Sequence, residues 1–202
     1  MSLWLAPHPL VLASKSFARR AMLEAAAIPL VLAPADIDER AIEARAAPGD
    51  AGDAAVLLAR EKARVVAARI GNRFVVGADQ TLTLNGKRFT KPTDRNAARE
   101  QLRALSGRTH ELHSAVAVGR DGRVVFSHVD VARMTMRALS DRFIDRYLDA
   151  IGMEATQSVG AYQLEKEGVH LFERIEGDHF TILGLPLLAL LGFLRREGFL
   201  DT

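Results

Sequence analysis

The sequence predicts a mixed α/β fold, and three of its features indicate this class. Short apolar runs typical of buried strands, such as Leu10–Leu12 and 74–78, alternate with longer stretches that have helical periodicity. Several helices follow a strand closely enough for part of the sheet to be parallel. Asn85-Gly86 and Asp121-Gly122, in contrast, mark hairpins between antiparallel strands. We therefore expect a mixed sheet with flanking helices, formed by residues 1–202 as a single domain.

The chain is expected to begin with a strand that turns into a helix. Pro9 precedes the apolar run at Leu10–Leu12, and good helix formers follow the segment ASKSFARR. Ser14 or Ser16 is therefore the expected N-cap of this first helix. A second short strand is expected at 30–32.

A long helix is predicted from Asp53 to Ile70, after a loop at 46–54, with Gly71 as its stop. The spacing of its apolar residues predicts one buried stripe along the helix. This stripe is expected to contain Val56, Ala59, Ala63, Val66 and Ile70.

The second half of the chain continues the alternation of helices and strands. Asp94 is expected to cap a helix that ends at Ser106-Gly107, and a hairpin of two strands, 110–118 and 123–136, follows. Leu139-Ser140 then opens another helix.

The last part of the chain repeats the pattern once more. Strands are expected around 170–175 and 180–183, before a helix with Pro186 in its first turn and Gly198 after its end.

Composition restricts the classes of function. The 202 residues are 49% hydrophobic, which is enough for a real core, and the formal net charge is only +2. Basic residues are mixed with acidic ones, a pattern that argues against a nucleic-acid partner. The absence of cysteine excludes disulfides and thiolate chemistry. No membrane segment is expected, because the apolar run at 187–194 is far too short to span a bilayer. The predicted location is therefore cytoplasmic.

The segment ASKSFARR poses an electrostatic problem. Lys15, Arg19 and Arg20 crowd the start of a helix, where the exposed N–H groups already carry partial positive charge. A capped helix with solvated arginines is the plain interpretation. A phosphate site is the functional one, since serine hydroxyls, free N–H groups and guanidinium groups would converge on one anion.

Three further segments carry residues suited to phosphate or metal chemistry. Asp79 follows the apolar run at 74–78, so it is expected at a strand end, where a carboxylate is held rigidly. If the hairpin at Asn85-Gly86 continues far enough, Gln80 faces Lys91, and Lys91 lies near Asp79. An acidic cluster at 36–39 and the Glu61-Lys62 pair complete the set, although each has an ordinary surface interpretation as well.

Taken together, these motifs resemble those of the Maf family, and the resemblance covers nearly the whole chain. In order, the matching segments read LVLASKSFARRAML, DIDE, LAREKA, VVGADQ, KP, LSGRTHE, GAYQLEKEG and FERIEGDHFTILGLPL. Members of this family are regarded as nucleoside triphosphate pyrophosphatases, and the family was once named for inhibition of septum formation. The resemblance implies an elongated mixed sheet with helices, in two lobes around a central cleft as in inosine triphosphate pyrophosphatases, and a homodimer.

The resemblance also implies roles for individual residues. Asp79 is the expected proton acceptor, and Glu39 and Asp79 would bind a divalent cation, Mg²⁺ or Mn²⁺. The phosphates of the nucleoside triphosphate would be held by a set of polar and basic residues. This set consists of Ser14, Lys15, Arg19, Arg20, Lys62 and Lys91.

Base preference is expected to depend on Ala18, Gln80 and Glu165. Gln80 and Glu165 resemble the family branch that acts on 7-methyl-GTP, and Glu165 could accept two hydrogen bonds from a guanine. The family usually has proline followed by arginine or an aromatic where this chain has Phe17-Ala18. Without an aromatic at Ala18, stacking on the base depends on Phe17.

Three alternatives remain open from the sequence. The chain could be a binding protein that inhibits septum formation through a partner, a pyrophosphatase of the dTTP and UTP type, or one that removes deaminated purines such as inosine triphosphate. Other hydrolase classes are disfavoured because the chain has no G-x-x-x-x-G-K-[ST], G-x-S-x-G or H-E-x-x-H motif.

Overall fold

The computed structural model describes residues 3–201, whose helices and strands alternate along the chain. The elements are β1 (Leu10–Leu12), α1 (Phe17–Ala25), β2 (Leu30–Leu32), α2 (Glu39–Ala46), α3 (Ala51–Ile70), β3 (Val75–Leu84), β4 (Lys87–Phe89), α4 (Arg95–Leu105), β5 (Thr109–Arg120), β6 (Arg123–Met136), α5 (Asp141–Ile151), η1 (Gly152–Thr156), η2 (Val159–Ala161), η3 (Glu167–Leu171), β7 (Phe172–Glu176), α6 (His179–Ile182) and α7 (Leu187–Arg196).

The strands form one seven-stranded sheet of mixed type. Its order is β2-β1-β3-β5-β6-β7, and β4 pairs with β3 outside this path. β1 is parallel to both β2 and β3, whereas β3 with β4 and β6 with β7 are antiparallel. The predicted mixed sheet with flanking helices is therefore confirmed.

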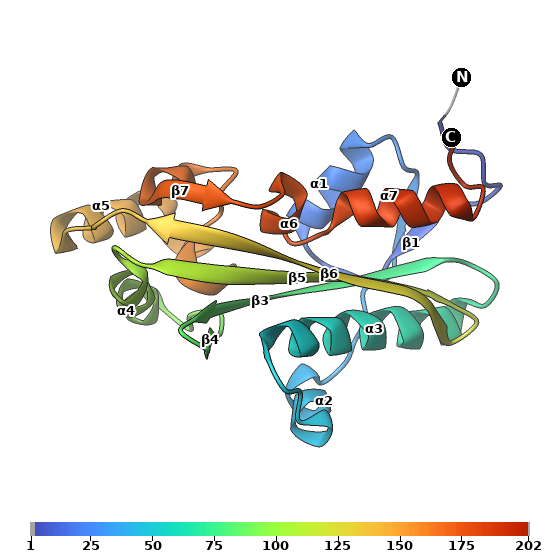
Figure 1. Cartoon of the computed structure of the whole chain (residues 1–202), viewed down its shortest axis with the longest axis horizontal. Helices are drawn as coiled ribbons and strands as arrows, with labels where there is room; N and C mark the ends of the chain where they lie inside the picture. The colour runs from blue at the N-terminus through green and yellow to red at the C-terminus, as the bar shows by residue number, and fades with distance from the viewer. Residues whose placement is uncertain (1–2, 202) are drawn as a thin grey trace. The chain divides into compact units, whose positions relative to one another are not determined.

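The chain forms two compact units, which are described separately. Unit 1 consists of Met1–Gln80, Ser114–Asp130 and Gly184–Thr202, and unit 2 of Thr81–His113 and Val131–Leu183. In unit 1, α3 lies along one face of the sheet, and α1 and α7 lie on the other (Figure 1). No helix within residues 3–201 is long and apolar enough to cross a membrane.

The α3 helix approaches the sheet closely because small residues face each other. A Cβ atom at Gly77 would lie 2.5 Å from the backbone N of Ala63, and one at Gly119 would lie 2.8 Å from the Ala63 carbonyl oxygen. Neither position therefore tolerates a side chain without displacing the helix. This packing brings the polar residues of α3 close to those of β3.

The predicted buried stripe of α3 is wrong at two positions. Val56 is only partly buried and Ile70 is 37% exposed, whereas Ala55 and Ala67 are fully buried. The physical reason is the close contact with Gly77, since a helix at that distance turns its smallest side chains toward the sheet. The other three members of the stripe are buried as predicted.

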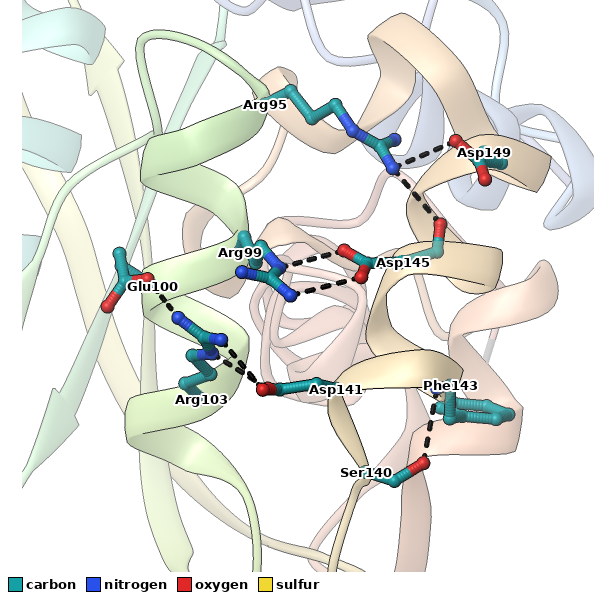
Figure 2. A network of polar contacts seen from close by, with 9 residues as sticks. All are labelled: Arg95, Arg99, Glu100, Arg103, Ser140, Asp141, Phe143, Asp145 and Asp149. Atoms are coloured by element: carbon teal, nitrogen blue, oxygen red, sulfur yellow. Dashed lines mark hydrogen bonds and ion pairs between the residues drawn. The ribbon is translucent and has the colours of Figure 1, made fainter.

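Unit 2 has its own apolar core around Leu102, Leu112 and Met134. Figure 2 shows a ladder of ion pairs between its helices α4 and α5. In this ladder Arg99 forms two hydrogen bonds to the Asp145 carboxylate, at 2.7 and 3.0 Å. The ladder joins the outer sides of two helices whose inner sides contribute to the core.

Turn and cap residues define most of the predicted boundaries. Asn85 and Gly86 have φ values of 51° and 78°, as their two-residue hairpin turn requires, and Leu84 pairs with Lys87. Asp94 caps α4 and Ser140 caps α5, as predicted. The predicted loop at 46–54 is shorter than expected, because α2 ends at Ala46 and α3 begins at Ala51.

The predicted strand at 180–183 is wrong, because this segment forms α6. The Asp178 side chain accepts hydrogen bonds from the backbone N–H of Thr181, at 2.9 Å, and from its hydroxyl, at 3.2 Å. This cap starts a single helical turn that ends before Gly184, whose φ is 91°. The apolar run therefore supplies core residues from a helix.

Candidate active site

The segment between β1 and α1 is organised by its two serines. Ser16 is the N-cap of α1, and its hydroxyl accepts from the backbone N–H of Arg19 at 3.4 Å. Ser14, which is 9% exposed, accepts from the backbone N–H of Ser16 at 3.2 Å and from Nη1 of Arg19 at 3.3 Å. The sequence left either serine open as the cap, and the structure assigns that role to Ser16.

Arg19 resolves the electrostatic problem of this helix start. Its Nε donates to the Gly184 carbonyl at 2.8 Å, and its Nη1 donates to the Ala78 carbonyl at 2.8 Å. The guanidinium therefore donates to backbone carbonyls of two other segments of unit 1. Protein oxygens compensate a charge for which the sequence suggested an anionic ligand.

The other two basic residues of this segment have surface positions. Arg20 pairs with Glu24 through Nε and Oε1 at 2.7 Å, and both side chains are about half exposed. Lys15 is exposed in the loop before the helix. The three basic side chains thus have different surroundings, and only Arg19 contacts the buried part of the site.

Asp79 lies within β3 and not at its end, which corrects the expectation from sequence. β3 continues to Leu84, but its parallel neighbour β1 ends at Leu12, which pairs with Val76. Asp79 therefore lies beyond the end of β1, where the chain leaves the sheet toward α1. This is the side of a parallel pair where ligand sites commonly form.

One lysine joins the two predicted metal-binding carboxylates. Nζ of Lys62 lies 2.6 Å from Oε1 of Glu39 and 2.6 Å from Oδ1 of Asp79. The side chains of Lys62 and Asp79 are both 12% exposed, whereas that of Glu39 is 50% exposed. Glu39 is the first residue of α2, which Asp38 caps. Three separate elements, α2, α3 and β3, thus supply the cluster.

Burial dominates the electrostatics of this cluster. It raises the pKa of Asp79, outweighing the opposite effects of Lys62 and Arg19, and Glu39 raises it further. Burial also lowers the pKa of the Arg19 guanidinium, against the attraction of Asp79 and Glu39. A carboxylate with a raised pKa is a better proton acceptor than an ordinary aspartate.

The donor set of the cluster is suited to a hard divalent cation. Glu39 and Asp79 both direct an oxygen at one point, where the Lys62 ammonium now lies. No group of three or more His, Cys, Asp or Glu residues that could hold a metal occurs within residues 3–201. A pair of carboxylates nevertheless fits Mg²⁺, which retains waters and takes further oxygens from phosphates.

The predicted base-specificity residues are divided between the two units. In unit 1, Ala18 is partly buried in α1, and Gln80 donates through Nε2 to the Ser114 hydroxyl at 2.9 Å. Glu165 is an exposed residue of unit 2.

Lys91 is also an exposed residue of unit 2. The β3–β4 pairing ends at Leu82 and Phe89, so the hairpin does not extend to a pairing of Gln80 with Lys91. The hairpin register therefore gives no support for placing Lys91 beside Asp79.

Two residues of the site were not singled out from the sequence. Gly184 supplies the carbonyl that fixes Arg19, and a Cβ atom at this position would lie 3.5 Å from both Arg19 Nε and Gln80 Oε1. Ser114 orients the Gln80 amide. Gly184 could have been found from the sequence, because a glycine directly after an apolar run indicates a turn. No sequence pattern connects Ser114 to Gln80.

Comparison with known proteins places the chain among close relatives. The family model for Maf-like protein matches residues 9–197. A protein of Nitrobacter hamburgensis named nucleoside triphosphate pyrophosphatase is 58% identical over 201 residues, which cover 100% of each chain. One of Brucella abortus named 7-methyl-GTP pyrophosphatase is 52% identical over 194 residues, which cover 95% of this chain and 98% of the relative.

Similarity to solved structures is weaker. A dITP/XTP pyrophosphatase from Mycobacterium abscessus aligns over 95% of each chain, with a TM-score of 0.45 and 15% identity. The family model matches most of the chain, and these two relatives are more than 50% identical to it. These matches confirm the resemblance seen in the motifs. The chain belongs to the Maf-like protein family.

Proposed function

We propose that the chain hydrolyses a nucleoside triphosphate between its α and β phosphates, producing a nucleoside monophosphate and pyrophosphate. The cluster of Glu39, Lys62 and Asp79 carries this proposal, because it combines a buried base with a cation and a carboxylate pair. A binding module would not require this combination. The names of the relatives in Nitrobacter hamburgensis and Brucella abortus support the same reaction.

In the proposed reaction, Asp79 accepts the proton of the attacking water. The water oxygen forms a bond to the α phosphorus, and the bond from that phosphorus to the bridging oxygen breaks as pyrophosphate leaves. The raised pKa of Asp79 favours the proton transfer, and its position within a strand keeps the carboxylate in place. Lys62 and the Ser14 hydroxyl are the proposed phosphate contacts in unit 1, and Arg19 holds the loop that carries Ser14.

A divalent cation, Mg²⁺ or Mn²⁺, is the proposed cofactor. Glu39 and Asp79 would hold it, together with the phosphate oxygens of the substrate. When bound, it would offset phosphate charge and acidify a water for Asp79 to deprotonate. The convergence of the two carboxylates on one point supports this assignment.

The proposed substrate class is a guanine-type nucleotide such as 7-methyl-GTP. Glu165 offers a carboxylate to the N1–H and amino group of guanine, and a methylated guanine carries positive charge that a carboxylate favours. The name of the Brucella abortus relative supports this choice. Glu165→Gln should remove a preference for 7-methyl-GTP over UTP, whereas Glu167→Gln, at an exposed position two residues away, should retain it.

The decisive experiment measures pyrophosphate release from a panel of nucleotides with Mg²⁺ or Mn²⁺. The panel contains 7-methyl-GTP, GTP, ITP, dTTP and UTP. We expect turnover by the wild type and none by Asp79→Asn, while Asp149→Asn, at a surface position with a side chain 72% exposed, should retain full activity. A preference for dTTP and UTP would contradict the proposed base class. Absence of release from every nucleotide would contradict the proposed reaction.

A further inference from the structure

The ammonium of Lys62 occupies the place where a divalent cation would meet its carboxylate ligands. Its Nζ lies 2.6 Å from an oxygen of Glu39 and 2.6 Å from an oxygen of Asp79, so these two oxygens are at most twice that distance apart. Two carboxylates at this separation repel each other when both are ionised, and a cation that contacts both stabilises the pair. In the structure, the lysine performs this task.

The buried side chains of this region differ in how easily they can move. Asp79 is held on β3 with 12% of its side chain exposed, and Arg19 beside it is fixed by two backbone carbonyls. Lys62 reaches the carboxylates through a flexible four-carbon stem that ends in a point charge without directional preference. Of the two buried members of the cluster, Lys62 is thus the one whose charged end can move with less rearrangement than Asp79, and the half-exposed Glu39 is free to adjust to either cation.

One lysine neutralises only one of the two carboxylate charges. A divalent cation neutralises both, but the same oxygens cannot remain in contact with the ammonium and the metal without placing two cations side by side. Occupation by the metal and occupation by Lys62 are therefore mutually exclusive at these two oxygens.

We propose that Lys62 is the resident counter-ion of the metal-free site, and that a divalent cation displaces its ammonium from Glu39 and Asp79. The displaced ammonium then becomes available to a phosphate group, and this second consequence rests on the proposed function. Before the metal binds, the ammonium of Lys62 would keep the two carboxylates together. The exchange would also couple metal binding to the release of a phosphate-binding cation.

Binding of Mn²⁺ to the full chain without nucleotide tests the exchange. Lys62→Met removes the competing charge while keeping a long side chain with good helix propensity. We expect Lys62→Met to bind Mn²⁺ at least ten-fold more tightly than the wild type, as measured by the electron paramagnetic resonance signal of free Mn²⁺. Lys87→Met, at an exposed position of β4, should bind like the wild type. Unchanged or weaker binding by a folded Lys62→Met protein would overturn the proposal.

A second measurement on the wild type avoids any dependence on the variant. The side-chain ammonium signal of Lys62 in a ¹⁵N-labelled sample should shift during a titration with Mg²⁺, with the same midpoint as metal binding. A Lys62 signal that stays constant while Mg²⁺ binds would overturn the exchange. Neither measurement involves nucleotide hydrolysis, so a failure of the proposed function would appear separately, in the pyrophosphate assay.

Discussion

Replacing Arg19 with alanine is expected to destabilise the protein clearly, although the residue lies in a segment that first suggested ligand binding. The substitution removes the donors to the carbonyls of Ala78 and Gly184, both of which are buried residues. A buried polar group that loses its partner costs about 1–3 kcal/mol. Because the Arg19 side chain retains some contact with solvent, water replaces part of the loss, and we expect a total of about 2–4 kcal/mol.

Arg20 provides a matched control for this prediction, since it is the next residue of the same helix. Its pair with Glu24 is exposed and spans one helical turn, so Arg20→Ala should cost only about 0.3–0.5 kcal/mol. Both variants would be compared with the wild type by urea denaturation, with turnover measured in parallel. Arg19→Lys, which keeps the charge but cannot bridge two carbonyls, should be destabilised like the alanine variant.

One result would refute the argument for Arg19. If Arg19→Ala is no less stable than Arg20→Ala but loses substrate binding, the guanidinium acts on the ligand and not on the protein backbone. The expected loss of stability is opposite to the effect of the helix dipole alone, since removal of a cation from a helix N-terminus would leave stability unchanged or slightly raised.

Three other perturbations test separate parts of the structure. Asp79→Asn should abolish pyrophosphate release without lowering the urea midpoint at pH 7. Because the folded pKa of Asp79 is raised, the stability that this group contributes to the fold at low pH is lost as the pH rises, so the neutral asparagine should cost none at pH 7. A marked drop in the midpoint would contradict this. Burial lowers the pKa of His110 from 6.5 to about 4, so stability should fall by up to about 3 kcal/mol as the pH drops from 6.5 to 4, and His110→Gln should flatten that profile in denaturation experiments. In unit 2, a double-mutant cycle on Arg99 and Asp145 should give a coupling of about 0.5–1 kcal/mol that weakens in high salt, and a salt-independent value would argue against an ionic origin.

Turns, helix caps and short strands could be predicted from the sequence where a few adjacent residues decide the conformation. The Asn85-Gly86 turn, the caps at Asp94 and Ser140, and the strand before ASKSFARR all appear where they were predicted. Each depends on a backbone requirement or a hydrogen bond that residues close in sequence satisfy by themselves. The segment at 180–183 shows the limit of such rules, since its apolar composition suits a strand or a buried helix equally, and the Asp178 cap made it a helix.

The sequence by itself determined the mixed α/β class, the family and the residue types available for chemistry. Only the tertiary structure decided what each charged residue contacts, because those partners lie on elements far apart in the chain. Arg19 meets a carbonyl 165 residues away, and Lys62 meets Asp79 because Gly77 allows α3 to approach β3 closely. A charge placed near other elements is drawn to whichever oppositely charged or dipolar groups packing brings within reach, and no local pattern of residues records that distance.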